Sequence, residues 1–209
     1  MAFIDTISAS WVTGEAFAMY DRQQKHYGYV PSYATVFSHR PEVMRRWGEL
    51  LAAIKRPMDR RRFELATFAA AHELRSTLCT LAHGKALLAF FSAEDVLALG
   101  RGETPPSLSA AEAALMRFAR AVARDASAVT ADNVAELTQH GYSDAEVFDI
   151  VATAAGRAFF SKVIASLGVA TDAPLRELDP EFRAALAVGR PIEFVAPQRL
   201  DDPEFRAVG

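Results

Sequence analysis

Residues 59–91 constrain the fold more than any other part of the chain. From Phe63 onward the sequence predicts a helix. Alanines and large apolar residues would cover most of its circumference, and a helix that is apolar on all sides lies in a protein interior. Glu64 is an acid within that apolar surface, where a carboxylate needs a partner or loses its charge. We therefore expect a fold organised around a buried helix that carries one acidic side chain.

The rest of the chain also favours helices, and no segment alternates with the period of two that is typical of a half-buried strand. Apolar stripes and capping pairs predict helices in residues 4–29, 33–39, 41–54, 92–100, 109–124, 132–139 and 144–167. The expected fold class is therefore all-α, a multi-helix bundle of about eight helices.

One helical domain is expected over residues 1–171, with N-terminal helices in 1–54, motif helices in 59–91 and C-terminal helices in 109–168. Residues 172–209 are rich in Pro, Asp, Glu and Arg. They predict a C-terminal extension that is extended or depends on a partner, with a short helix at 180–188.

Composition excludes several classes of function. The 26 acidic residues outnumber the 23 basic ones, which leaves no electrostatic footprint for nucleic acid. No stretch approaches the roughly 18 apolar residues of a membrane span, and the first ten residues lack the pattern of a signal peptide. A single cysteine forms no internal disulfide and fits a reducing compartment. We expect a soluble cytoplasmic protein without nucleic-acid or membrane partners.

The sole cysteine, Cys79, begins the candidate chemistry. His83 follows it by four positions, so on a helix its imidazole shares a face with the thiol and can accept or return the thiol proton. Ser76 lies three positions before Cys79, and S-x-x-C-x-x-x-H reads like a C-x-x-C redox motif whose first sulfur is replaced by oxygen. If Ser76 and Thr77 begin a new helix, its positive end favours the Cys79 thiolate. An unbroken helix would give no such help.

Structural interpretations compete with these chemical ones. A lone cysteine in an alanine-rich helix is commonly a small buried apolar side chain. His83 can be a hydrogen-bonded core histidine, and Glu64 can form a structural ion pair with an arginine at 60–62 or 75. No H-E-x-x-H or comparable spacing is present, so we expect neither a metal nor a cofactor.

These residues resemble the alkylhydroperoxidase D-like (AhpD-like), or carboxymuconolactone decarboxylase, family. The family signature is a helix with a Glu, followed by C-x-x-C-x-x-x-H, and Glu64, Cys79 and His83 fall at its spacing. HGYSDAEVFDIVATAAGRAFFSKVIASLGV is similar to the family's closing helix. GYVPSYATVFSHRPEVMRRWGELLAAI resembles the region upstream of the motif in the peroxidase-related subgroup. The resemblance covers roughly residues 28–171 and implies an AhpD-like bundle.

The resemblance also implies roles for the motif residues. Cys79 would attack a hydroperoxide, with His83 as its base and Glu64 as a relay or orienting group. Ser76 stands where the family has its resolving cysteine. Because a hydroxyl forms no disulfide, the implied cycle uses one cysteine, and an external thiol reduces the sulfenic acid. Family members generally assemble as trimers, or as hexamers built from trimers, so a homotrimer or homohexamer is expected.

Three functions remain open at this point. The first is a peroxidase-like oxidoreductase that depends on Cys79. The second is an acid–base enzyme that acts on a small lactone or carboxylate through His83 and Glu64, with Cys79 a bystander. The third is a non-catalytic oligomeric scaffold. Cys79→Ser would abolish activity only in the first.

Overall fold

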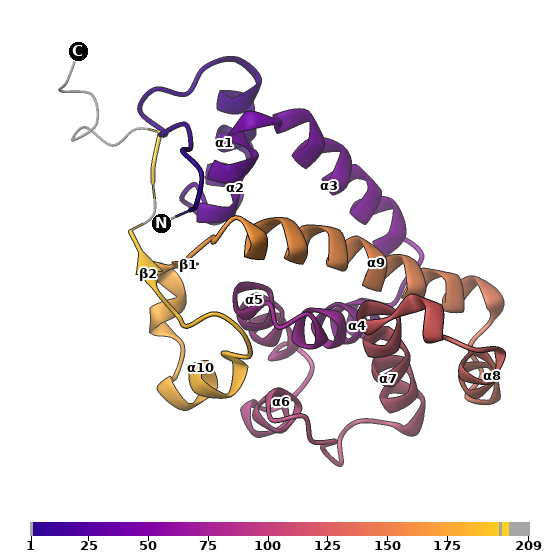
Figure 1. Ribbon diagram of the computed structural model, residues 1–209. Helices are drawn as coiled ribbons and strands as arrows, with labels where there is room; N and C mark the ends of the chain where they lie inside the picture. Colours follow the sequence, from indigo (N-terminus) through magenta and orange to yellow (C-terminus); the bar gives the residue numbers. More distant parts are fainter. Residues whose placement is uncertain (1, 197, 201–209) are drawn as a thin grey trace. The chain divides into compact units, whose positions relative to one another are not determined.

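A computed structural model describes residues 2–196 and 198–200 (Figure 1). The described residues contain ten α-helices: α1 Gly14–Tyr27, α2 Ser32–Val36, α3 Pro41–Lys55, α4 Arg60–Glu73, α5 Thr77–Leu87, α6 Ala93–Gly100, α7 Ala110–Arg124, α8 Ala131–Gln139, α9 Asp144–Ser166 and α10 Pro180–Leu186. Two strands of two residues, β1 Thr171–Asp172 and β2 Phe194–Val195, pair in parallel. The all-α prediction is confirmed. There are more helices than the expected eight because the motif run divides into α4 and α5, and because the short helix predicted at 180–188 forms as α10.

Local signals place several helix starts where the sequence predicts them. Ser109 and Glu112 form a reciprocal capping box at the start of α7. Ser143 and Glu146 exchange the same pair of hydrogen bonds before α9. Each pair satisfies backbone N–H groups that have no partner within the first helical turn.

The first predicted helix, residues 4–29, is wrong in its N-terminal part, because α1 begins only at Gly14. The preceding backbone pairs with distant segments instead. The Phe3 N–H donates to the carbonyl of Leu167 at 2.8 Å, and the Ala9 N–H donates to Oε1 of Gln198 at 2.8 Å. In a helix these backbone N–H groups would donate to carbonyls within the same segment, but here they donate to residues far along the chain.

The chain divides into two compact units. Unit 1 is formed by residues up to 49, residues 163–177 and residues from 192 onward, while unit 2 is formed by residues 50–162 and 178–191. All the motif residues belong to unit 2. The predicted domain boundary after residue 171 stays a prediction.

The predicted buried helix is confirmed in α4. Its residues from Phe63 to Ala71 are all buried, and the helix packs against α5 and α7 in unit 2 (Figure 1). α10 lies against α5 and α6, where the fully buried Leu186 side chain meets Gly84. A Cβ at Gly84 would lie 2.6 Å from that side chain, so a larger residue there would force Leu186 to shift.

The segment after α10 is packed onto unit 2, although the sequence predicts an extended or partner-dependent tail there. The Gly189 N–H donates to Oγ1 of Thr77 at 3.0 Å, and that hydroxyl donates to the carbonyl of Arg190 at 2.8 Å. A Cβ at Gly189 would overlap the carbonyl of Arg75. The segment is therefore tied to the first residue of α5, close in sequence to Cys79.

Unit 1 combines α1, α2 and the two short strands. Tyr20 is fully buried, and its hydroxyl donates to the carbonyl of Ile7 at 2.6 Å. Strands of two residues are too short to produce an alternating pattern, so the sequence gives no sign of them.

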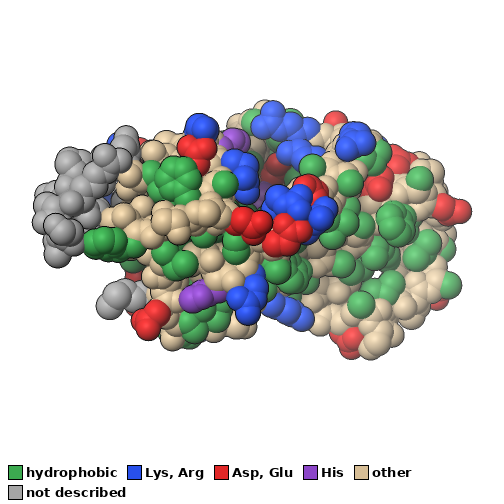
Figure 2. Space-filling view, turned by 90° about the horizontal axis from the view of Figure 1, so that it is seen from above, with side chains coloured by type: hydrophobic (Ala, Val, Ile, Leu, Met, Phe, Trp, Pro, Cys, Tyr) green, Lys and Arg blue, Asp and Glu red, His purple; other side chains and the backbone are tan. Residues whose placement is uncertain are grey.

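Charges of both signs lie side by side on the surface. Figure 2 shows Lys and Arg side chains beside Asp and Glu side chains, with hydrophobic side chains between them. In the part of the chain that the structure describes, no helix has the length and apolar character that crossing a membrane requires.

Candidate functional site

The run that carries the motif is interrupted immediately before Cys79. α4 ends at Glu73, and Arg75 adopts a left-handed conformation with φ 54° that turns the chain. Ser76 is the N-cap residue of α5, which begins at Thr77. Cys79 is therefore the third residue of α5, within its first turn. Of the two alternatives that the sequence left open, the interrupted helix is the one found.

The Cys79 thiol is enclosed by two polar side chains from α9. Its Sγ accepts hydrogen bonds from Nη1 of Arg157 at 3.7 Å and from Oγ of Ser161 at 3.5 Å. Cys79, Arg157 and Ser161 are only 2%, 4% and 2% exposed. A guanidinium group and the positive end of a helix both favour a thiolate over a thiol. This arrangement therefore supplies a positive environment for the sulfur.

Glu64 and His83 form a second hydrogen-bonded group on α4 and α5. Nδ1 of His83 lies 2.8 Å from Oε2 of Glu64, while Nζ of Lys55 lies 3.9 Å from Oε1. An ionised carboxylate only accepts hydrogen bonds, so we assign the ring proton to Nδ1. The remaining nitrogen, Nε2, is then free to accept a proton.

Burial and charge set the protonation of this pair. Burial alone would raise the pKa of Glu64, but the hydrogen bond from His83 and the charges of Lys55 and Arg157 hold it below its ordinary value. Burial and the positive charge of Arg157 lower the pKa of His83, and Glu64 opposes them only in part. At neutral pH the pair consists of a carboxylate and a neutral imidazole that can act as a base.

The four predicted site residues thus belong to neighbouring helices but not to one hydrogen-bonded chain. In residues 2–196 and 198–200, no hydrogen bond joins Cys79 to His83 or to Ser76. Ser76 is buried at the α5 cap, where its carbonyl accepts from the N–H and the hydroxyl of Thr80. The catalytic roles of the four residues stay predictions.

Sequence reasoning missed the contribution of α9. Thr153, Arg157 and Ser161 are spaced by four along an otherwise apolar helix, and all three are buried. Polar residues at this spacing lie along one helix face. An arginine within this apolar run is the same kind of signal that singles out Glu64 in α4.

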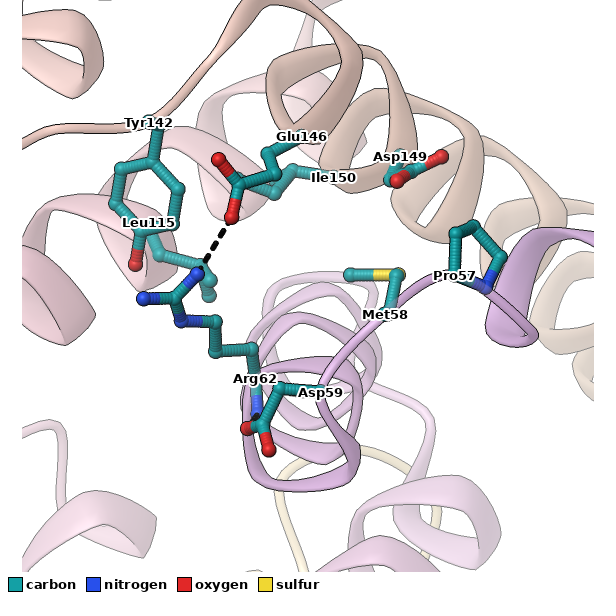
Figure 3. Close-up of a pocket in the computed structure, with 9 residues that line it drawn as sticks. All are labelled: Pro57, Met58, Asp59, Arg62, Leu115, Tyr142, Glu146, Asp149 and Ile150. Carbon is teal, nitrogen blue, oxygen red and sulfur yellow. Dashed lines mark hydrogen bonds and ion pairs between the residues drawn. The ribbon is translucent and has the colours of Figure 1, made fainter.

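Another hollow in unit 2 lies away from these groups. Figure 3 shows a pocket at the start of α4 in which Arg62 reaches toward Glu146, with 2.7 Å between Nη1 and Oε1. The Arg62 guanidinium lies against the Tyr142 ring, 4.9 Å from the ring centroid. The pocket has a volume of about 30 Å³, enough for a water or two, and none of the predicted site residues lines it.

No group of three or more His, Cys, Asp or Glu side chains that could hold a metal ion occurs in the described portion of the chain. The Glu64–His83 pair supplies at most two ligands of that kind.

Comparison with solved structures identifies the fold. An AhpD-core, peroxidase-related protein from Ralstonia eutropha JMP134 matches with a TM-score of 0.68 and 19% identity, covering 90% of this chain and 98% of that one. A peroxidase-related protein from Silicibacter sp. TM1040 has a TM-score of 0.68 and 17% identity, over 84% and 94% of the two chains. The chain therefore has the AhpD-like fold that the motif implied.

A third similar structure is the debrominase Bmp8, solved as a cysteine-to-alanine variant in complex with 2,3,4-tribromopyrrole. It has a TM-score of 0.62 and 17% identity, covering 81% of this chain and 88% of that one. No protein-family model matches the sequence, and no curated protein matches it either. At these identities the likeness extends to the fold, so the reaction has to be argued from the site.

Proposed function

We propose that this protein is a thiol oxidoreductase that reduces a hydroperoxide with a single cysteine, Cys79, and is recycled by an external thiol. The observation that carries the proposal is the environment of the Cys79 sulfur. It lies in the first turn of α5 and accepts a hydrogen bond from the Arg157 guanidinium. Reactive cysteines occur in electropositive and partly exposed surroundings. Cys79 meets the first condition, and because it is only 2% exposed, the reaction also requires local opening around the sulfur.

In the proposed reaction, the Cys79 thiolate attacks the terminal oxygen of the hydroperoxide. The S–O bond forms as the O–O bond breaks, and the leaving alkoxide takes a proton to become an alcohol. Cys79 is oxidised to a sulfenic acid and the peroxide is reduced. An external thiol then displaces water from the sulfenic acid, forming a mixed disulfide. A second thiol attacks that disulfide and returns Cys79 to its reduced state.

His83 and Glu64 would move the protons in this cycle. The neutral imidazole holds an acceptor at Nε2, and Glu64 fixes the ring by accepting from Nδ1. His83 follows Cys79 by one helical turn, and its side chain is 19% exposed, so it meets solvent more than the thiol does. Its assigned role is to take the thiol proton and deliver a proton to the leaving oxygen.

The test is intact-mass analysis after brief exposure to one equivalent of hydroperoxide and a sulfenic-acid trap, across a pH series. We expect selective trapping at Cys79 that persists well below about pH 8.5, where an ordinary thiol is mostly protonated. Cys79→Ser is the control and should trap nothing. A thiol that stays unmodified while the protein remains folded would overturn the proposal.

Reductive debromination is a second candidate because the similar structure of Bmp8 is a debrominase studied through a cysteine variant. In that reaction a carbon–bromine bond is replaced by carbon–hydrogen, bromide leaves, and two thiols become a disulfide. Bromide release from 2,3,4-tribromopyrrole in the presence of a thiol distinguishes it from peroxide reduction. The acid–base alternative on a lactone differs from both, because Cys79→Ser would leave it intact.

We also propose that the protein assembles as a homotrimer or homohexamer. Phe148 and Phe159 are 69% and 42% exposed, and they are eleven positions apart, about three helical turns, which places both on one face of α9. Sedimentation velocity should give the wild type a trimeric or hexameric mass. Phe148→Ser combined with Phe159→Ser should shift the mass toward the monomer. An unchanged distribution in the double variant would exclude this face.

A further inference from the structure

Unit 1 contains a partly open cavity of about 360 Å³ that the proposed thiol chemistry does not use. The N-terminal segment, the start of α2, the segment after α9 and the region around β2 surround it. We call it the unit 1 cavity. Its apolar walls include Ile4, Val30, Val169 and Val195. Its size falls at the lower end of the range for small-molecule sites.

A buried carboxylate lines this cavity. Asp172 is 3% exposed, and its Oδ1 accepts from the backbone N–H of Ser32 at 2.8 Å. No Lys, Arg or His of the described residues forms an ion pair with it. Burial raises the pKa of Asp172 above its ordinary value, and the hydrogen bonds from Ser32 offset this only in part. A buried carboxylate without a cation is costly, and a positive ligand would reduce that cost.

Two hydroxyl groups that line the cavity are used within the protein. The Ser32 hydroxyl donates to the carbonyl of Ala170 at 2.7 Å, and the Thr35 hydroxyl donates to the carbonyl of Ser32 at 2.8 Å. Both hydroxyl donors are therefore committed. The charged residues that line the cavity, Asp5 and Asp172, are both acidic. This lining disfavours an anion and suits a ligand that brings its own hydrogen-bond donors.

We propose that the unit 1 cavity binds a small organic cation, a protonated primary amine on a compact apolar body, with the ammonium group at Asp172. The ammonium supplies charge-assisted hydrogen bonds to the carboxylate. The apolar body covers the valine and isoleucine side chains of the walls. This site involves neither Cys79 nor the Glu64–His83 pair.

Benzylamine and benzyl alcohol are suitable probes because they share size and shape but differ in charge at neutral pH. Isothermal titration, with ligand-observed NMR for weak complexes, should show that benzylamine binds the wild-type protein at least about tenfold more tightly than benzyl alcohol. Absence of benzylamine binding, or equal binding of the two probes, would overturn the proposal.

Variants place the amine in the cavity. Asp172→Asn should weaken benzylamine binding at least about tenfold. Asp21→Asn, which removes the same charge from the exposed surface of α1, should leave it unchanged. Val195→Phe narrows the cavity while keeping the carboxylate and should also weaken binding. Thermal unfolding checks that each variant is folded. Wild-type affinity in both cavity variants contradicts the assignment.

Discussion

Glu64 in unit 2 and Asp172 in unit 1 are both buried carboxylic acids, 6% and 3% exposed, yet their pKa values move in opposite directions. Burial disfavours the ionised form in both. Glu64 has the hydrogen bond from His83 and the positive charges of Lys55 and Arg157, which outweigh burial. Among the residues that the structure describes, Asp172 has only hydrogen bonding from Ser32, and burial prevails. The partners of a buried acid therefore decide its charge.

This difference separates two uses of a carboxylate. An acid that is already paired, such as Glu64, can orient another group, and here it fixes the ring of His83. An acid that pairs with no cation of the described residues, such as Asp172, retains the capacity to hold a ligand. The same residue chemistry therefore supports a positioning role in one unit and a binding role in the other.

Removing the partner of Glu64 should have the largest effect. His83→Leu leaves a buried carboxylate that has lost its hydrogen bond, and we expect a loss of about 2–3 kcal/mol in the free energy of unfolding at pH 7. Urea denaturation measures it. The lowered pKa of His83 means that the wild type itself loses stability as the pH falls below 6.5, so the deficit should narrow there. His140→Leu, at an exposed position, is the control. A deficit no larger than in that control contradicts the pairing.

Changing each acid to its amide should give effects of opposite sign. Glu64→Gln weakens the hydrogen bond with His83 and should cost about 1–2 kcal/mol at pH 7. Asp172→Asn keeps an acceptor for the Ser32 N–H but removes an unpaired buried charge, so it should stabilise the fold by up to about 1 kcal/mol. Urea denaturation of both variants is the measurement. If both variants changed the free energy of unfolding in the same direction, the partners of a buried acid would not decide whether its charge stabilises the fold.

The pH dependence of these two effects follows from the pKa directions. The stability that ionised Glu64 contributes is present above pH 4.5 and is lost as the pH falls through its lower folded pKa. The cost of ionised Asp172 is present above its raised folded pKa and disappears as the pH falls through that value toward 3.8. Both differences from the wild type should therefore shrink in acid.

Much of the fold could be predicted because its signals are local. Capping pairs such as Ser109 with Glu112 fix helix starts within four residues of sequence. The segment before Gly14 could not be predicted, since its backbone pairs with Leu167 and Gln198, far away along the chain. The packing of Gly189 against Arg75 likewise brings together residues that are far apart in the sequence.

The site could be predicted only in part, for the same reason. The motif spacing identifies Glu64, Cys79 and His83 as candidates, but it does not show which of these side chains are in contact. The contact between Arg157 and Cys79 spans 78 residues, and the sequence shows only an arginine inside an apolar helix. The sequence did not indicate that Asp172 is buried, because its burial depends on segments of unit 1 that are far apart along the chain.

The smallest expected effect tests Arg157, whose positive charge acts on both Glu64 and His83 and whose guanidinium donates to Cys79. Arg157→Gln removes the charge and Arg157→Lys keeps it. The glutamine variant should alkylate at Cys79 about fivefold more slowly below neutral pH, because the thiolate loses a charge-assisted donor. Its His83 pKa should rise, since the charge that lowers it is gone. The lysine variant should stay close to the wild type in both respects.

Iodoacetamide kinetics across pH and an NMR titration of the His83 ring measure the two changes. Identical profiles in all three folded proteins would mean that Arg157 only fills space beside the sulfur.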